Sequence, residues 1–498
     1  MLTPEREWRR IAAWSYVAVA AQLLLTVPLA FALNIGKDDA YTLASTGQGA
    51  AYALHQAIFF EQNAPLYFVV MSLWRAIDGS APFARLFSVL CAAATVLALP
   101  ALLRRYFASA RHGWLVAAAA FNPFLIWAAL DIRLYALVIL LSTLLLITFH
   151  DAFLAERRAP QALAAFAGTA IAGMYTQYYI GFLLAAMGLA LARRRRRAAL
   201  REYALMAAGV ALAFAPMLPL LPGQLASFRG AFAAPGSPLA SAQTLASILL
   251  GYLFPVDAST GAGWILLALL VGAVALGYLV LKSRSPLEGG VIVEVFVLSA
   301  AVFALVVYLA QERILYRHPA LLFVPALVSV FALVTLLREP LRGRVTAALG
   351  VVLLMASATT LVGTYRPLAK TGDWARVARY LRSQAVQGQP IVVFEAEYAV
   401  PLAYYYRGPN PVVPVPVAVN FRTYDVASYV LRDGDQVSRA LERVPGTHRT
   451  IWLVAGDRCR AQNIEYGCDV LERYVREHYR VLSTRAFYGS TVRLLAVR

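Results

Sequence analysis

Two adjacent carboxylates follow the first long apolar stretch of the chain. The stretch covers residues 11–33, and Asp38 and Asp39 stand just beyond it in the segment NIGKDDAYTLASTGQGAA. A carboxylate at the exit of an apolar segment is most often a solvated interface residue, but ionisable groups at membrane depth mark functional sites. A carboxylate held beside a substrate hydroxyl can act as a general base. This segment is therefore a candidate for proton-transfer chemistry.

Three further stretches place carboxylates, arginines and tyrosines beside apolar segments. They are ALDIRLYAL, with Asp131, Arg133 and Tyr135; YTQYY, with Tyr175, Gln177 and Tyr178; and QERILYRHP, with Arg313 and Arg317. The planar guanidinium of arginine binds phosphate oxygens through two parallel hydrogen bonds. One aqueous cavity that collects all four stretches would offer carboxylates for base chemistry and arginines for an anion.

Each of these stretches also has a purely structural interpretation. Asp131 and Arg133 can form an ion pair at a helix junction, and the tyrosines at 175–179 are typical of the aromatic belt at a membrane interface. Arg313 and Arg317 can mark the end of a spanning segment. The choice between these interpretations depends on whether the surrounding elements bring the four stretches together.

The composition indicates that those elements are membrane helices. The 498 residues have a mean hydropathy of +0.63, and only 14% are charged, compared with about 25% in soluble domains. A helix needs roughly 20 apolar residues to cross a bilayer. The sequence predicts eleven spans, near residues 11–33, 82–103, 113–130, 133–155, 160–176, 178–192, 203–222, 263–281, 290–310, 317–337 and 345–364.

The arginines orient these spans. With alternating topology, one set of loops carries 19 basic residues, including the run Arg193–Arg197, and the opposite set carries 7. Cytoplasmic loops are enriched in Lys and Arg, so the first set and the N-terminus are predicted to be cytoplasmic. The formal charge of +18 is thereby explained as a topology signal rather than as a nucleic-acid-binding surface. The protein is expected in the cell inner (plasma) membrane.

This topology places the whole loop 34–81 on the outer side. Its apolar part, APLYFVVMSLWRAI at residues 64–77, is short. Counting it as a span would invert the charge bias of every later loop. We therefore expect a helix that lies in the outer interface, with Tyr67 and Trp74 at the level of the lipid headgroups.

The composition changes near residue 365, which divides the chain into a membrane domain, 1–365, and a soluble domain, 366–498. DWARVARYLRSQAV has helical periodicity, PIVVFEA and RTIWLVAG are short β-rich runs, and RVLSTRAFYG with TVRLLAV predicts a hairpin. The C-terminal region is thus predicted to be an α/β domain in the periplasm or outside the cell. Disulfides persist in such compartments, so we expect Cys459 and Cys468 to form one.

The order of these stretches resembles bacterial membrane glycosyltransferases of the GT-C superfamily, in particular the dolichyl-phosphate-mannose protein mannosyltransferase and aminoarabinose transferase families. The resemblance rests on DDAYT, APLYFVVMSLWRAIDG, ARLFSVL, LDIRLYAL, YTQYYIG and YRHPALLFVPAL in that order. It implies a GT-C-like fold in which Asp38 takes the place of the catalytic aspartate. Asp131, Arg133 and Tyr135 match the family's Glu-x-Arg-x-Tyr turn. Asn63 stands where a basic residue is expected near the donor phosphate, and Gln177 replaces a histidine.

The resemblance implies an inverting transferase that moves a sugar from a polyprenyl-phosphate donor to an extracytoplasmic acceptor. The acceptor would be lipid A, an envelope polysaccharide or a protein. Asp38, Asp39 and Asp131 are then the candidate catalytic carboxylates, and the other named polar residues are candidates for substrate binding. No cluster of His and Cys has metal-ligand spacing, no cofactor is assigned, and participation of a divalent cation is left open.

Two other functions are consistent with the sequence. A flippase or transporter for lipid-linked glycans would also need polar groups around a cavity. It would keep them near the bilayer midplane, usually within duplicated halves, whereas the chain shows no internal repeat and its ionisable groups cluster at outer helix ends. A catalytically inactive relative is the other alternative, and it is suggested by Asn63 and Gln177.

Overall fold

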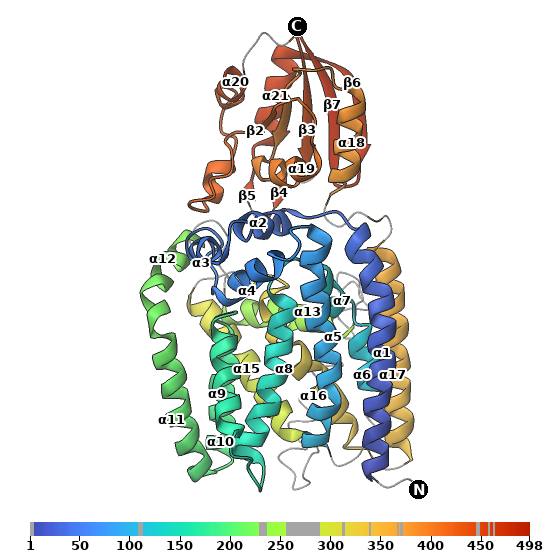
Figure 1. The fold of residues 1–498 in the computed structure, drawn as a ribbon, viewed down its shortest axis with the longest axis vertical. Helices are drawn as coiled ribbons and strands as arrows, with labels where there is room; N and C mark the ends of the chain where they lie inside the picture. The colour runs from blue at the N-terminus through green and yellow to red at the C-terminus, as the bar shows by residue number, and fades with distance from the viewer. Residues whose placement is uncertain are drawn as a thin grey trace.

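The computed structural model describes residues 4–498 except 108–112, 229–236, 255–288, 311–313, 338–339, 366–367, 369–371, 445–448, 457–458 and 462–463. A helical bundle forms one end of the molecule and an α/β unit forms the other, with the N-terminal helix beginning at the far end of the bundle (Figure 1). The described helices of the bundle are α1 (Pro4–Ala32), α2 (Lys37–Ser45), α3 (Ala50–Phe59), α4 (Leu66–Arg75), α5 (Ala81–Tyr106), α6 (Gly113–Ala120), α7 (Pro123–Leu130), α8 (Tyr135–Phe149), η1 (His150–Leu154), α9 (Ala162–Met174), α10 (Ile180–Arg193), α11 (Arg197–Phe214), η2 (Ala215–Leu220), α12 (Leu221–Phe228), α13 (Pro238–Leu253), α15 (Gly290–Leu309), η3 (His318–Leu322), α16 (Phe323–Val334) and α17 (Leu341–Thr364).

Within the described residues, six helices are long and apolar enough to cross a membrane. They are Glu5–Ala32, Ala81–Tyr106, Tyr135–Leu154, Arg197–Gln224, Gly290–Leu309 and Leu341–Thr364. The pair α6 and α7, bent by 46°, adds a seventh if it is one span. These helices establish a membrane protein. Shorter apolar helices cover the predicted spans 160–176, 178–192 and 317–337, whereas 263–281 lies outside the described residues. The count of eleven therefore stays a prediction.

The break between α6 and α7 has a local cause in the sequence. Residues 113–130 were expected to form one span, but Asn122 and Pro123 interrupt it. Proline cannot continue the hydrogen-bond pattern of a helix, and it disfavours helical geometry in the residue before it. Asn122 instead caps α7, because its side chain accepts a hydrogen bond from the backbone N–H of Phe124 at 2.9 Å.

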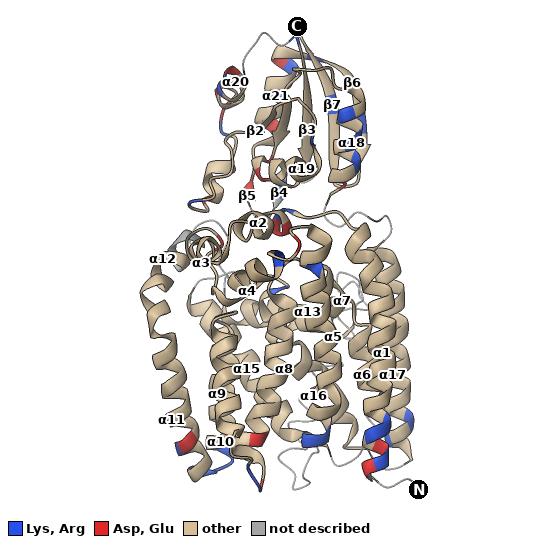
Figure 2. Ribbon diagram, viewed as in Figure 1, with Lys and Arg blue, Asp and Glu red and all other residues tan. Residues whose placement is uncertain are grey.

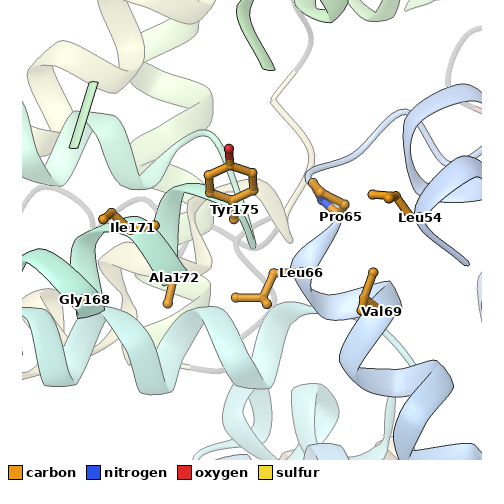
Figure 3. A pocket seen from close by; sticks show the side chains of 8 residues that line it. All are labelled: Leu54, Pro65, Leu66, Val69, Gly168, Ile171, Ala172 and Tyr175. Carbon is orange, nitrogen blue, oxygen red and sulfur yellow. The ribbon is translucent and has the colours of Figure 1, made fainter. Parts of the chain in front are cut away.

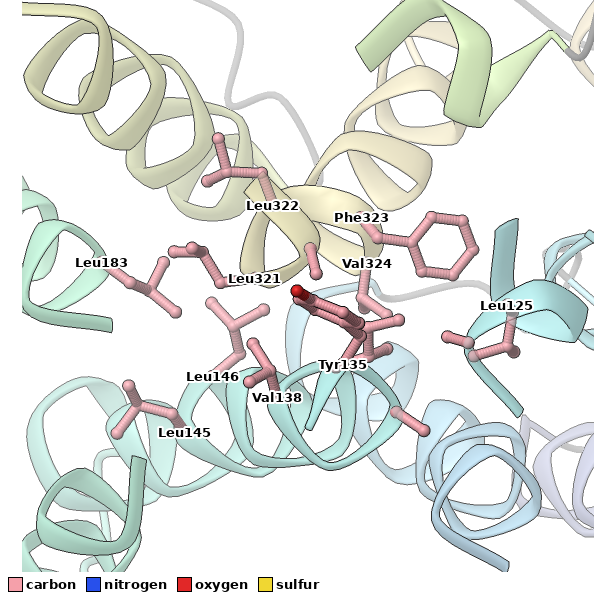
Figure 4. Packing of buried hydrophobic residues seen from close by; sticks show 14 of the residues in the cluster. Leu125, Tyr135, Val138, Leu145, Leu146, Leu183, Leu321, Leu322, Phe323 and Val324 are labelled. Carbon is pink, nitrogen blue, oxygen red and sulfur yellow. The ribbon is translucent and has the colours of Figure 1, made fainter. Parts of the chain in front are cut away.

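A continuous apolar core fills the bundle. Figure 4 shows side chains from α7, α8, α10, η3 and α16 meeting around Tyr135. Tyr135 is 5% exposed and Leu146 and Leu321 are fully buried. Charged residues lie mainly at the two ends of the bundle, at the end remote from the α/β unit and directly beneath α2 (Figure 2). The second group contains the residues singled out by the sequence.

The α/β unit is built on a five-stranded sheet with strand order β2-β1-β3-β7-β6. β1 is parallel to β2 and β3, and β7 is antiparallel to β3 and β6. The elements are α18 (Trp374–Gln384), β1 (Ile391–Phe394), η4 (Ala396–Tyr398), α19 (Ala399–Tyr405), β2 (Val412–Val415), η5 (Val426–Tyr429), α20 (Asp435–Glu442), β3 (Thr450–Gly456), β4 (Arg460–Ala461), β5 (Ile464–Glu465), α21 (Cys468–His478), β6 (Tyr479–Phe487) and β7 (Ser490–Val497). The predicted helix, the two predicted strands and the C-terminal hairpin are confirmed by α18, β1, β3 and β6–β7.

Candidate active site

Helix α2 carries the first pair of candidate carboxylates and lies between the bundle and the α/β unit (Figure 1). Gly36 precedes it in extended conformation, and its backbone N–H donates to Oδ2 of Asp39 at 2.8 Å. Asp38 and Asp39 both occupy the first turn. Carboxylates are favoured there because the unpaired N–H groups give the helix start a partial positive charge. The sequence therefore fixes where the helix starts and which residues its first turn presents.

Asp39 points into the protein and holds α2 in place. It is 1% exposed, and its Oδ1 atom accepts a hydrogen bond from the backbone N–H of Ile132 at 2.8 Å. Its Oδ2 atom lies 3.4 Å from Nη2 of Arg85, which is also 1% exposed. Arg85 in turn donates to three backbone carbonyls at the end of α1, those of Ala30, Leu33 and Asn34. These contacts make Asp39 a positioning residue rather than a group that faces substrate.

Asp38 points the other way, toward Arg317. Nη1 of Arg317 donates to Oδ2 of Asp38, and the two side chains are 22% and 26% exposed. Burial acts to raise the pKa of Asp38, but attraction to Arg317, Arg133 and Lys37 outweighs it and holds the pKa well below its ordinary value. Asp38 is therefore a partly accessible, ionised carboxylate in a cationic environment.

Arg133 supplies a second, more deeply buried cation. It is 7% exposed, and its Nη1 atom donates to Oε2 of Glu61 at 2.6 Å and to Oγ1 of Thr42 at 3.0 Å. The guanidinium also lies 5.9 Å from the ring centre of Phe68. A buried charge is tolerated only when it is paired and hydrogen-bonded. The carboxylate of Glu61 therefore compensates the charge of Arg133, and the hydrogen bond to Thr42 connects Arg133 to α2.

The segment that carries Arg317 is fixed by neighbouring rings and a backbone contact. Arg317 is the residue before η3, and the carbonyl oxygen of Tyr316 accepts a hydrogen bond from the hydroxyl of Tyr252 on α13. The ring of Tyr316 lies 4.9 Å from that of Trp127. Arg317 is thus held at the level of α2 by residues of α7 and α13. Arg313, the other arginine predicted in this stretch, lies outside the described residues.

Asp131 and Tyr135 flank Arg133 in the turn between α7 and α8. Asp131 is 6% exposed, and its backbone carbonyl accepts a hydrogen bond from Oγ of Ser88 at 2.8 Å. Burial raises the pKa of Tyr316, and the carboxylates of Asp131 and Asp38 act in the same direction. Asp131 therefore lies within electrostatic reach of the segment that carries Arg317. Asn63 lies beside Glu61 and donates to its backbone carbonyl at 2.6 Å.

Tyr175 and Tyr178 occupy a different environment, whereas the ring of Tyr179 lies 5.5 Å from that of His318, the residue after Arg317. The hydroxyl of Tyr175 donates to the carbonyl of Ala213 at 2.8 Å, and the ring of Tyr178 packs against Phe214 at 5.7 Å. Gln177 is 8% exposed, and its side-chain carbonyl has no hydrogen-bond partner within the part of the chain that the structure describes. The contacts of Tyr175 and Tyr178 place them against α11, not against Asp38.

Tyr175 also lines an apolar pocket between α3, α4 and α9. The pocket has a volume of about 420 Å³ and is lined by Leu54, Pro65, Leu66, Val69, Gly168, Ile171, Ala172 and Tyr175. Figure 3 shows these side chains surrounding the hollow, with Leu66 and Ala172 on facing walls. The backbone N–H of Leu66 donates to the carbonyl of Tyr175 at 2.8 Å, which joins the outer loop to the end of α9. The pocket suits an apolar chain.

Four charged residues of this region were not singled out by the sequence interpretation: Lys37, Glu61, Arg85 and Glu397. Glu61 is the one acidic residue between positions 40 and 77, so its isolation in the outer loop was an available signal. In the sequence analysis, Arg85 was used only in the count of basic residues that orients the spans. Glu397 stands in EAEYAVPLAYYY, 360 positions from its partner Lys37, and no local pattern marks that contact. Together with Asp38, Asp39, Arg133 and Arg317 they form what we term the outer charged cluster.

Cys459 and Cys468 are joined by a disulfide, with their Cα atoms 5.6 Å apart. The third cysteine, Cys91, is buried in α5 with a free thiol. Over the described ranges, no three residues of His, Cys, Asp or Glu are grouped so that they could hold a metal ion.

A scan against protein-family models and a search of curated proteins both find no match to this chain. Among solved structures, ArnT from Cupriavidus metallidurans bound to undecaprenyl phosphate aligns with a TM-score of 0.55 over 97% of this chain and 98% of ArnT, at 12% identity. The apo state of the same ArnT aligns with a TM-score of 0.51 over the same fractions, at 16% identity. The chain therefore shares the fold of ArnT, and the resemblance stated from the sequence is confirmed at the level of the fold.

Proposed function

We propose that this protein is a glycosyltransferase that moves a sugar from a polyprenyl-phosphate carrier to an acceptor hydroxyl, with Asp38 as general base. The observation that carries the proposal is the pair of Asp38 and Arg317. A carboxylate and a guanidinium, each about a quarter exposed, meet at the first turn of α2, the helix that lies between the bundle and the α/β unit. A transfer of this kind needs a base for the acceptor and a cation for the departing phosphate.

The chemistry follows from these two groups. The acceptor oxygen attacks the anomeric carbon of the sugar, and its proton passes to a carboxylate oxygen of Asp38. The bond between the anomeric carbon and the phosphate oxygen breaks, and the polyprenyl phosphate leaves with the electron pair. Attack from the side opposite the leaving group inverts the anomeric configuration. The departing phosphate monoester is already an anion near neutral pH, so it needs cations more than it needs an acid.

Arg317 has two tasks in this account. Without substrate it pairs with Asp38 and keeps the pKa of that carboxyl low, which makes Asp38 a weak base. A donor phosphate that draws the guanidinium away would raise the proton affinity of Asp38 when the substrate is in place. Arg133 is committed to Glu61 and Thr42, so we assign it the supporting role of maintaining a positive potential around the phosphate.

Two further features support a lipid-linked donor. ArnT, whose fold this chain shares, was solved with undecaprenyl phosphate bound. The apolar pocket between α3, α4 and α9 is close in sequence to Glu61 and Asn63, and we assign it to part of the prenyl chain. Glycan and lipid acceptors of the cell envelope and secreted proteins all fit the outer position that the loop charges predict for the site.

The proposal is tested with the full-length protein reconstituted in lipid nanodiscs. It is incubated with undecaprenyl phosphate carrying aminoarabinose, mannose, glucose or galactose, together with an envelope extract that supplies acceptors, and mass spectrometry follows the release of undecaprenyl phosphate. We expect release from at least one of these donors. The same donors in sealed proteoliposomes test the transporter alternative. Movement of an intact lipid-linked sugar across the bilayer, or binding without cleavage, would contradict the proposal.

A further inference from the structure

Glu397 of the α/β unit reaches the first turn of α2. It lies in η4, directly after β1, where Glu395 adopts the left-handed conformation with φ 55° and turns the chain sharply. β1 is parallel to both of its neighbours, and ligands of open α/β sheets bind outside the carboxyl ends of such strands. In this protein that edge of the sheet faces α2 (Figure 1), and Glu397 is 2% exposed there.

Three donors converge on the Glu397 carboxylate from two parts of the chain. Nζ of Lys37 lies 2.9 Å from Oε2, and the hydroxyl of Tyr41 donates to Oε1 at 2.7 Å. The hydroxyl of Tyr424 donates to Oε1 at 3.2 Å. Burial raises the pKa of the neighbouring Tyr466 to about 12, with Lys37 acting against that rise and Glu397 adding to it, so this phenol also stays protonated. The carboxylate is fully paired despite its burial.

The three donors link two segments that border Asp38. Lys37 and Tyr41 are four residues apart, so both lie on the face of α2 that meets the α/β unit. Tyr424 belongs to a segment that packs on α2 and α3, where the ring of Phe421 lies 4.9 Å from that of Phe60 and 6.2 Å from that of Tyr41. One carboxylate therefore holds the helix that carries Asp38 and the aromatic segment 421–424 beside it.

Helix α2 is thus fixed from two sides, with Asp38 between them. Asp39 binds the bundle through Arg85 and the backbone of Ile132, and Lys37 binds the α/β unit through Glu397. We propose that Glu397 is a positioning residue for Asp38. The α/β unit thereby helps to hold the active-site helix α2 in its working position. This inference rests on the proposed function, because it assigns Asp38 the role of base.

Other contacts across the same boundary make the inference testable. The backbone N–H of Ile35 donates to the hydroxyl of Tyr405 at 2.9 Å, and that of Ala375 donates to Oδ1 of Asn34 at 2.9 Å. The backbone N–H of Ala81 donates to the hydroxyl of Tyr404 at 3.1 Å. These bonds do not involve Glu397. A change at Glu397 is therefore expected to loosen α2 without detaching the α/β unit from the bundle.

The first test compares Glu397→Gln with Glu472→Gln in the full-length protein. Glu472 is a matched control in the same α/β unit, because it pairs with Arg493 in a contact that does not involve α2. A displacement of about 1 Å at a reacting group can cost about 10²-fold in rate. We expect Glu397→Gln to lower kcat by about 10- to 100-fold with a KM for the lipid donor within about threefold of wild type. Glu472→Gln should retain the wild-type kcat. Equal kcat values in the two variants would overturn the inference.

The second test does not depend on activity. Burial lowers the pKa of Lys37, but attraction to Glu397, reinforced by Tyr424, Tyr466 and Asp38, outweighs it and raises the pKa well above its ordinary value. Only the neutral amine reacts with acetic anhydride. The pH midpoint for acetylation of Lys37, followed by peptide mass spectrometry, should fall in Glu397→Gln and stay in place in Glu472→Gln. Lys282 and Lys370, the other two lysines of the sequence, serve as internal references. An unchanged midpoint in Glu397→Gln would overturn the inference.

The two tests separate failure of this inference from failure of the proposed function. If no polyprenyl-phosphate sugar is turned over by the wild-type protein, the proposed function fails, and the acetylation midpoint still reports whether Glu397 holds Lys37. If the wild type turns over the donor and Asp38→Asn does not, but Glu397→Gln behaves like Glu472→Gln in both tests, the positioning role alone is refuted. Thermal unfolding of both variants checks that any loss of kcat is not a loss of folded protein.

Discussion

Arg317 forms an ion pair with Asp38 across 279 positions of the sequence, through its Nη1 atom and the Oδ2 atom of the carboxylate. Asp38 lies in the first turn of α2, shortly after the first apolar segment, and Arg317 directly precedes η3. The pair makes the protonation of Asp38 depend on where the guanidinium of Arg317 lies.

The first prediction concerns the pH dependence of transfer. Arg317 lowers the pKa of Asp38, so Arg317→Gln should raise that pKa. The carboxylate must be ionised to accept a proton, and kcat/KM is therefore lost as the pH falls through the pKa of the free protein. We expect the acid limb of kcat/KM to move to higher pH in Arg317→Gln, and to stay in place in Arg480→Gln, which changes an exposed arginine of β6. Coincident acid limbs in Arg317→Gln and the wild type would refute the coupling.

The second prediction concerns the geometry of Arg133. Lysine keeps the positive charge, but its ammonium replaces a planar guanidinium whose Nη1 atom contacts both Glu61 and Thr42. Arg133→Lys should lower kcat/KM for the lipid donor by about 10-fold or more, since hydrogen bonds to charged groups contribute about 1.5–3 kcal/mol. Steady-state kinetics in nanodiscs provide the measurement, with Arg480→Lys, a change at an exposed residue of β6, as control. Wild-type kinetics in Arg133→Lys would show that charge alone suffices.

The third prediction separates Asp39 from Asp38 by stability. Asp39→Asn leaves the buried guanidinium of Arg85 without its carboxylate partner, and removal of one partner of a buried pair costs about 3–5 kcal/mol. Asp38 is partly exposed, so Asp38→Asn should change stability much less. Thermal unfolding of the detergent-solubilised protein should therefore show a lower Tm for Asp39→Asn than for Asp38→Asn. The reverse order would contradict the roles assigned to the two carboxylates.

The fourth prediction concerns the disulfide between Cys459 and Cys468, which are nine positions apart. In the chain-entropy model, closure of so short a loop stabilises the folded state by roughly 2–3 kcal/mol. The double variant Cys459→Ser/Cys468→Ser should show faster hydrogen exchange in α21 and should retain glycosyl transfer. Cys91→Ser is the control for loss of a thiol. Alkylation of both Cys459 and Cys468 in the denatured, unreduced wild type would show that the bridge does not form.

Much of the fold could be predicted from patterns that are local in the sequence. Apolar runs located the long helices, and short β-rich runs located β1 and β3, because both strands are buried along nearly all of their length. The break between α6 and α7 was also readable from Asn122 and Pro123, although the apolar run around them led to the expectation of one span. The number of spans is less accessible, since several apolar helices are shorter than a bilayer and 263–281 lies outside the described residues.

The candidate site was only partly accessible from the sequence. Asp38, Arg133 and Arg317 could be singled out because charges beside apolar segments are rare. Glu61, the partner of Arg133, and Glu397, the partner of Lys37, were not singled out. These contacts span 72 and 360 positions, and the isolation of Glu61 in the outer loop was the available local signal. Tyr175 illustrates the opposite case, because its aromatic context suggested the charged cavity whereas its ring lines the apolar pocket.

The central claim is that Asp38 is the base of a transfer from polyprenyl phosphate. The most direct measurement is the rate of undecaprenyl phosphate release by Asp38→Asn, with Asp78→Asn as control. Asp78 is an exposed carboxylate of the same outer loop whose Oδ1 atom accepts a hydrogen bond from the backbone N–H of Ser80. We predict that Asp38→Asn lowers kcat by about 10²–10⁴-fold while the protein stays folded and still binds the lipid donor, and that Asp78→Asn retains wild-type activity. Wild-type release by Asp38→Asn would contradict the account.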